Sequence, residues 1–124
     1  MKDEFISKAK ENITVAEWSY ENGHYNASAN RAYYAAFQAA IAALAHIGIN
    51  TVSHSHKATQ AHFVAELIKR RKIYPSHLKS YLKDLQDVRN DADYELKFVS
   101  KKIAGRQYRH AKEFVELIAQ EIEK

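Results

Sequence analysis

The stretch that decides the fold is residues 26–47, NASANRAYYAAFQAAIAALAHI. Alanine has the highest helix propensity, and neither proline nor glycine interrupts the stretch. Its apolar residues lie around much of the circumference of a helix, which is typical of a helix covered by neighbours on several sides. We therefore expect a central helix over Asn26–Ile47, with Tyr34 and Phe37 buried. Asn30 and Arg31 need polar partners inside such a helix, because an unpaired buried polar group is costly.

Four further helices are predicted from apolar residues that recur every three or four positions. One covers about Lys2–Asn22 and ends at Gly23, and another covers about His56–Arg71. Pro75 lies in the first turn of the next helix, where its missing N–H costs nothing, and Ser100 caps the last helix. No segment alternates as a β-strand does. The predicted fold is all-α, an antiparallel up-and-down four-helix bundle with an additional short helix.

The length of 124 residues suits one domain, spanning residues 1–124. Cysteine is absent, which excludes disulfides, a thiolate zinc site and a cysteine nucleophile, and which fits a reducing compartment. The first residues show no signal-peptide pattern, and no stretch approaches the roughly 18 apolar residues of a membrane span. We therefore expect a cytoplasmic protein that does not interact with membranes.

Positive charge is concentrated in residues 67–112, which hold 13 Lys and Arg against 5 Asp and Glu, a net charge of +8. Such a block attracts polyanions, including nucleic acid. A solvated basic surface is the alternative interpretation. Lys102 and Arg106 lie one helical turn apart in this block and are predicted to contact the phosphates of a substrate.

The segment most informative about function is residues 84–95, DLQDVRNDADYE. Arg89 offers a fixed positive charge for a phosphate, and Asn90 offers a polar amide beside it. Tyr94, five residues after the arginine, carries an ionisable hydroxyl. Phosphodiester chemistry needs such a cation together with a group that transfers a proton. These three residues are the candidate catalytic set.

Helix geometry limits how this set can act together. If the helix ran on without a break, Tyr94 would point about 140° away from Arg89. A shared site therefore requires the helix to end near Ala92, or requires a partner subunit. An ion pair between Arg89 and Asp93, one turn further on, is the structural alternative to a phosphate site.

Three blocks of the sequence resemble the HEPN family, whose name stands for higher eukaryotes and prokaryotes nucleotide-binding. They are NRAYYAAF at 30–37, SHS at 53–55 and DVRNDADY at 87–94. The resemblance runs over most of the chain and implies an all-helical homodimer. In many members an arginine, a polar residue, a short gap and a histidine form a metal-independent endoribonuclease site at the dimer interface. Such members often act as toxins paired with a small nucleotidyltransferase antitoxin.

Arg89 and Asn90 match the arginine and the polar residue of that motif, whereas Tyr94 stands in place of the histidine. The chain thus resembles a branch with Arg-Asn-x-Ala-Asp-Tyr instead of Arg-x4-6-His. Histidine transfers protons near neutral pH, while a tyrosine hydroxyl titrates near 10, so RNA cleavage is not the default expectation. His54 matches a family position and is predicted to face the cleft. A surface or capping role is its alternative.

Two functions remain open at this point. The first is a toxin-like homodimer that binds RNA or a nucleotide and, if active, is a metal-independent endoribonuclease. The second is a non-catalytic nucleotide-binding or protein-interaction module that partners a minimal nucleotidyltransferase. The remaining predicted substrate contacts of the cleft are Asn30, Arg31, His54 and Asp93.

No cofactor or metal is expected. His54, His56 and His62 are close in sequence, but nothing fixes a further ligand, and no carboxylate lies near them in the chain. The sequence also has no phosphate-binding glycine loop, no dinucleotide-binding fingerprint and no zinc-ribbon spacing.

Overall fold

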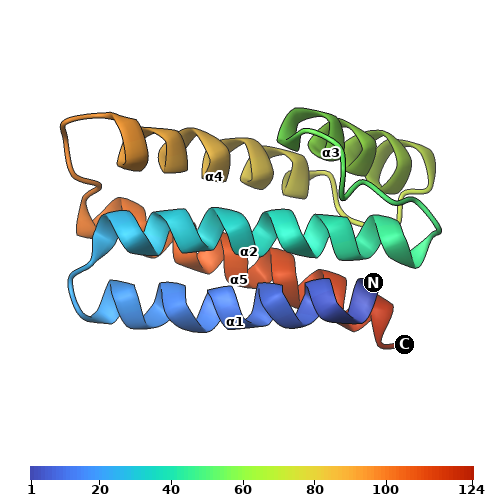
Figure 1. Cartoon of the computed structure of the whole chain (residues 1–124), viewed down its shortest axis with the longest axis horizontal. Coiled ribbons are helices and arrows are strands. Elements are labelled where there is room, and N and C mark those ends of the chain that lie inside the picture. Colours follow the sequence, from blue (N-terminus) through green and yellow to red (C-terminus); the bar gives the residue numbers. More distant parts are fainter.

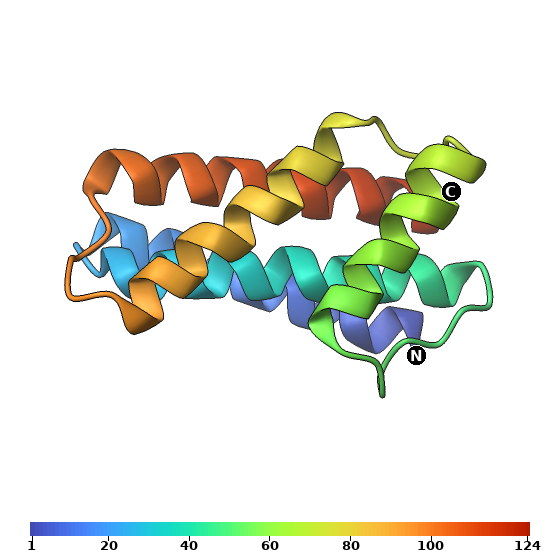
Figure 2. The same cartoon turned by 90° about the horizontal axis from the view of Figure 1, so that it is seen from above.

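The computed structural model describes all 124 residues, which form helices and connecting turns with no β-strand. The all-α prediction is confirmed. In Figure 1, the helices α1, α2 and α5 lie lengthwise beside one another, and Figure 2 shows α4 crossing obliquely over α2 and α5. None of the helices combines the length and the apolarity needed to cross a membrane. The helical segments are α1 (Lys2–Glu21), α2 (Tyr25–His46), α3 (His56–His62), η1 (Phe63–Arg70), α4 (His77–Tyr94) and α5 (Lys101–Ile122).

Helix α2 is the centre of the molecule, as predicted, and contacts every other helical segment. Its alanines let the neighbouring helices approach closely, and the side chains of Tyr33 and Leu44 are completely buried. Phe37 is also buried. The prediction that Tyr34 is buried was wrong: it is half-buried at the edge of the core, because its hydroxyl turns toward Arg89.

The predicted helix over residues 56–71 forms, but its geometry changes at Phe63. The Ser55 side chain caps its start by accepting a hydrogen bond from the Ala58 N–H at 3.0 Å. From Phe63 onward η1 is a π-helix, so that the Arg71 N–H donates to the Glu66 carbonyl five residues earlier, at 3.1 Å. Together α3 and η1 pack against α2 and bury Phe63.

The start of α4 differs slightly from the prediction. Pro75 precedes the helix, which begins at His77, and its carbonyl accepts a hydrogen bond from the Leu78 N–H at 3.2 Å. The predicted capping of α5 by Ser100 is confirmed, since its hydroxyl accepts from the Ile103 N–H at 3.1 Å. The expected apolar face of α4 also forms, with Leu78, Leu82 and Leu85 buried.

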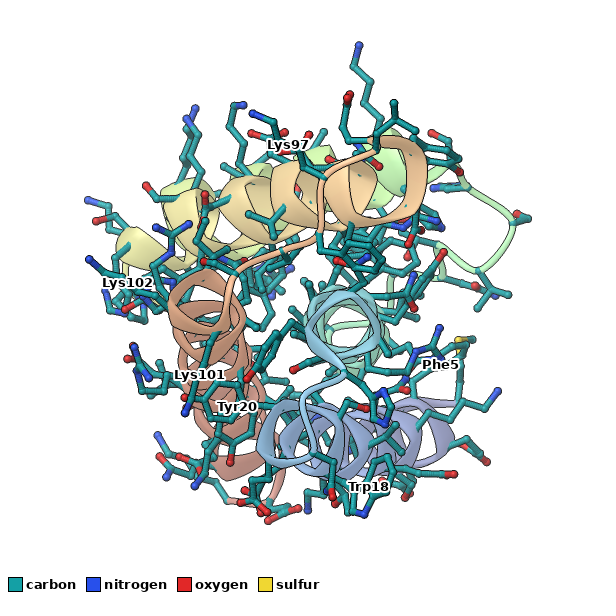
Figure 3. The ribbon with its side chains drawn as sticks, turned by 90° about the vertical axis from the view of Figure 1, so that its left-hand side faces the viewer. Phe5, Trp18, Tyr20, Lys97, Lys101 and Lys102 are labelled. Atoms are coloured by element: carbon teal, nitrogen blue, oxygen red, sulfur yellow. The ribbon has the colours of Figure 1, made fainter.

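Close approach of α1 and α5 depends on a glycine in α5. A Cβ atom at Gly105 would lie only 3.0 Å from the ring of Tyr20, which Figure 3 labels between these helices. The Tyr20 ring also stacks on Tyr108, with ring centroids 6.5 Å apart. Glycine therefore has a packing role here that offsets its low helix propensity.

Candidate functional site

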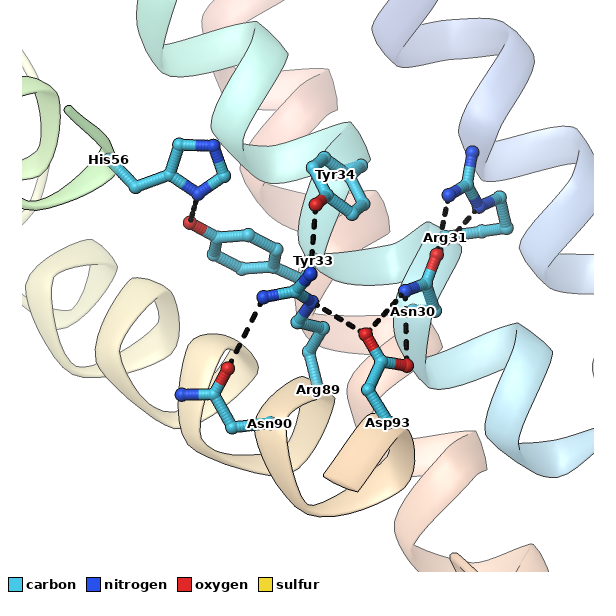
Figure 4. Close-up of polar contacts among 8 residues, drawn as sticks. All are labelled: Asn30, Arg31, Tyr33, Tyr34, His56, Arg89, Asn90 and Asp93. Atoms are coloured by element: carbon cyan, nitrogen blue, oxygen red, sulfur yellow. Dashed lines mark hydrogen bonds and ion pairs between the residues drawn. The ribbon is translucent and has the colours of Figure 1, made fainter. Parts of the chain in front are cut away.

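Arg89 points from α4 toward α2, where three side chains hold its guanidinium group (Figure 4). Nη2 donates a hydrogen bond to the Tyr34 hydroxyl at 3.0 Å, and Nη1 donates to Asn90 Oδ1 at 3.3 Å. Nε lies 2.9 Å from Asp93 Oδ2, so the predicted ion pair is confirmed, although the N–H is not directed at the oxygen. The Arg89 side chain is only 17% exposed, which makes this pair more enclosed than a surface salt bridge.

Asp93 is in turn fixed by a second set of polar side chains. Asn30 Nδ2 donates to both carboxylate oxygens of Asp93, at 3.2 and 3.1 Å. Arg31 Nε donates to Asn30 Oδ1 at 2.9 Å, and its Nη1 reaches Asn12 Oδ1 at 3.4 Å. The expectation that these two polar residues of α2 need partners is thus confirmed. A continuous polar chain runs from α1 through α2 to Arg89 on α4.

Tyr94 lies beside Arg89 even though α4 does not end near Ala92. The helix continues through Tyr94, and the expectation that this would separate the two side chains was wrong. The tyrosine is the last residue of the helix, and its ring centroid lies 5.9 Å from Arg89 Cζ. Tyr94 is 75% exposed, and its hydroxyl makes no hydrogen bond within the protein.

The structure adds a histidine that the sequence did not single out for this site. His56, the first residue of α3, has its Nδ1 3.1 Å from the Tyr33 hydroxyl, and Gln60 Nε2 donates to the same hydroxyl at 3.0 Å. The His56 ring packs against Phe37, with centroids 4.1 Å apart. Burial, and secondly the positive charge of Arg89, lower the pKa of His56 below its usual 6.5. The imidazole is therefore neutral at pH 7.

The partner of His56 keeps its proton. Burial raises the pKa of Tyr33 to about 12, so its hydroxyl stays protonated at physiological pH. The contact with Tyr33 occupies Nδ1 of His56 and leaves Nε2 without a partner in the protein. When Nδ1–H donates to the Tyr33 oxygen, Nε2 has a free lone pair and can accept a proton; in the other tautomer Nε2–H can only donate. His56 and Arg89 both lie against the rings of Tyr33 and Tyr34.

His54 lies outside this cluster. It is exposed, and its ring lies against that of His62, with centroids 5.5 Å apart. The Ser55 cap begins the helix at His56, which directs this second histidine, and not His54, toward α2. Nowhere in the structure do three or more His, Asp or Glu side chains gather in a way that could hold a metal ion.

Lys102 and Arg106 also lie apart from Arg89. Arg106 Nη2 is 3.3 Å from Asp84 Oδ2, in a contact between α5 and α4. Asp84 and Arg89 are five residues apart on α4 and therefore about 140° apart around the helix. Lys102 points outward from α5 in Figure 3. The structure thus brings Asn30, Arg31 and Asp93 together between α2 and α4, and separates them from His54 and from the basic residues of α5.

One known protein family matches this chain. The model of the HEPN domain matches residues 3–122, almost the whole chain. No curated protein matches the chain. Every residue of the cluster around Arg89 lies inside the matched range.

Proposed function

The chain belongs to the HEPN family, and from this we propose that it binds a phosphate of RNA or of a nucleotide at Arg89. One observation carries the proposal. A guanidinium group held by Tyr34, Asn90 and Asp93 shares its aromatic neighbours, Tyr33 and Tyr34, with a neutral histidine, His56. Arginine recognises phosphate through paired hydrogen bonds, and a fixed guanidinium loses little entropy when it does so.

The same geometry supports metal-independent RNA cleavage. In this reaction the ribose 2′-hydroxyl attacks the adjacent phosphorus, and the bond to the 5′-oxygen of the next nucleotide breaks. With His56 in the tautomer that carries its proton on Nδ1 and donates it to the Tyr33 oxygen, Nε2 accepts the proton of the 2′-hydroxyl, and Tyr94 or a water molecule protonates the leaving 5′-oxygen. Arg89 stabilises the negative charge that develops on the phosphate oxygens. The products are a 2′,3′-cyclic phosphate and a 5′-hydroxyl.

We further propose that the protein is a homodimer that pairs through the segment between α4 and α5. Leu96 is fully exposed and Phe98 is 84% exposed, and the same segment lines an apolar hollow of about 660 Å³. Protruding apolar side chains next to a hollow suit an isologous contact, in which each copy fills the hollow of the other. Such pairing would bring the two Tyr94 side chains close together.

A second candidate function is favoured by one residue. Tyr94 stands where the ribonuclease motif of the family has histidine, as in the branch with Arg-Asn-x-Ala-Asp-Tyr. In that case the cluster binds a nucleotide, or a minimal nucleotidyltransferase that acts as antitoxin, and cleaves nothing. In both cases we propose a cytoplasmic, toxin-like protein.

The alternating directions of α1, α2, α4 and α5 in Figure 1 support describing them as an antiparallel four-helix bundle.

The test is to incubate the purified protein with total RNA and with tRNA, with and without EDTA. The Arg89→Lys variant keeps the charge but loses the paired hydrogen bonds, and Arg109→Lys, exposed on α5, is the matched control. EDTA-resistant cleavage that Arg89→Lys abolishes and the control retains supports the ribonuclease. Binding without cleavage, weakened only by Arg89→Lys, supports the second candidate. If the protein neither binds nor cleaves RNA and binds no nucleotide, both are wrong.

A further inference from the structure

A second basic feature lies between α3–η1 and α4. It is a groove of about 380 Å³, here named the lysine groove, whose rim carries Lys57, Lys69, Lys79 and Lys83. All four lysines are exposed. Its floor is formed by small aliphatic side chains that include Ala61. No Asp or Glu lines it.

The positive charge of the groove is almost uncompensated. Only Lys83 forms an ion pair, with Asp87 at 3.1 Å, and both side chains are more than half exposed. Such a pair is weak and gives way readily to another anion. Lys57, Lys69 and Lys79 have no ion-pair partner. Four neighbouring cations in one hollow create a field that concentrates anions.

Helix stability explains the position of Lys69 but not those of Lys57 and Lys79. Positive charge is favourable at the C-terminal end of a helix, which accounts for Lys69 near the end of η1. Lys57 and Lys79, however, lie in the first turns of α3 and α4, where the helix dipole disfavours positive charge. Their position therefore points to a ligand.

The groove adjoins the cluster around Arg89 at Gln60. This side chain lines the groove, and its Nε2 donates to the Tyr33 hydroxyl, which contacts His56. Lys57 of the rim also follows His56 directly in the chain, so the groove begins next to the cluster. The groove has no aromatic side chain on which a base could stack and no arginine for paired contacts, so it suits point-charge contacts to a backbone.

We propose that the lysine groove binds the phosphodiester backbone of single-stranded RNA next to the phosphate held at Arg89. This inference rests on the proposed function and assigns the flanking part of the same substrate to a defined surface. Its contacts are independent of base sequence. The groove therefore sets the length of RNA that binds tightly, while the Arg89 cluster holds the phosphate that reacts.

The experiment compares two variants of equal charge. The groove variant is K57Q/K69Q/K79Q/K83Q, and the control K8Q/K101Q/K112Q/K124Q removes four exposed lysines elsewhere. Affinity is measured for a labelled 20-nucleotide single-stranded RNA and for the dinucleotide UpU at several salt concentrations. Thermal melting checks that both variants fold.

Each lost phosphate contact lowers the slope of log affinity against log salt by about 0.7 for a single strand. If two of the four lysines contact phosphates, the slope falls by about 1.4, which corresponds to about 25-fold weaker binding at 0.1 M salt relative to 1 M. We expect this loss for the groove variant with the 20-nucleotide RNA only. Its affinity for UpU, which reaches no further than the Arg89 cluster, stays unchanged.

Equal losses of RNA affinity in the groove and control variants would show that only the total charge of the protein matters. This result would overturn the groove proposal and leave the Arg89 proposal intact. The groove would instead belong to a protein partner if an acidic amphipathic peptide bound the parent but not the groove variant while RNA affinity was unaffected. Failure of the parent to bind either RNA would refute RNA as the ligand of the Arg89 site and, with it, the premise of the groove proposal.

Discussion

His56 offers the sharpest test of the chemistry, because the family motif does not require it and the geometry does. We predict that His56→Gln abolishes most RNA cleavage while the protein stays folded and binds RNA. Glutamine keeps a polar group near the Tyr33 hydroxyl, so Tyr33 is not left without a partner. The stability cost is then limited to about 1 kcal/mol, the usual contribution of one hydrogen bond. The phosphate contacts of Arg89 remain.

The expected magnitude follows from the role of a general base. A positioned proton acceptor contributes about 10²–10⁴-fold to a rate, so cleavage by His56→Gln falls by at least about 100-fold. The pH dependence has a definite sign. A base acts only when neutral, and the pKa of His56 is lowered below 6.5 by burial and by Arg89. Cleavage by the parent therefore persists below pH 6.5 and decreases only at lower pH.

The assay is single-turnover cleavage of a labelled RNA in EDTA from pH 4.5 to 8, with RNA affinity measured in parallel. His54→Gln is the matched control, because His54 lies only two residues away and outside the cluster. It should cleave at the parental rate. If His56→Gln cleaves as fast as His54→Gln, or if the acid side of the parental profile lies above pH 6.5, His56 is not the base.

Other variants test separate parts of the structure. Phe37→Ala should lower the free energy of unfolding by about 3–5 kcal/mol, as measured by urea denaturation, because it empties the contact between α2 and His56. Tyr94→His should speed cleavage in EDTA without changing the melting temperature, since Tyr94 is exposed; an inactive variant would show that the motif position is not catalytic. L96E/F98E should shift the protein from dimer to a monomer of 14.3 kDa in light scattering, and a parent that is already monomeric would exclude the proposed pairing. Phosphate at tenfold its Kd should stabilise the parent by about 1.4 kcal/mol, but not Arg89→Gln, in melts at constant ionic strength.

Most of the helical architecture could be predicted from the sequence, because burial of apolar surface dictates the pattern. The alanine-rich stretch over residues 26–47 has apolar residues on nearly all sides, and only a central position accommodates that. The cap at Ser100 and the Arg89–Asp93 pair are local, so they follow from spacing alone. The π-helical geometry after Phe63 left no comparable signal, since it depends on how that segment packs against α2.

The polar site was harder to predict. Periodicity shows which residues share a helix face, but it does not show which neighbouring helix that face contacts. Choosing between His54 and His56 required knowing which of them faces α2, and the predicted start of the helix near His56 did not decide this. The i, i+4 spacing of His56 and Gln60 was the available signal. Arg106 shows the same limit: it contacts Asp84 on α4, about 140° around that helix from Arg89, and spacing along α5 gave no sign of this contact.

The charge balance of the cluster supports the proposal that it binds an anion. Arg31 and Arg89 are both partly enclosed, yet Asp93 is the only carboxylate paired with either of them. Arg31 is held by amide oxygens of Asn12 and Asn30, which satisfy its hydrogen bonds but do not neutralise its charge. Enclosed charge is tolerated when an opposite charge pairs with it. Arg31 and Arg89 carry two positive charges and Asp93 carries one negative charge, so one unit of positive charge in the cluster has no counterpart in the protein. In the proposed complex, a phosphate would supply the missing negative charge at the oriented guanidinium of Arg89, close to the proposed base, His56.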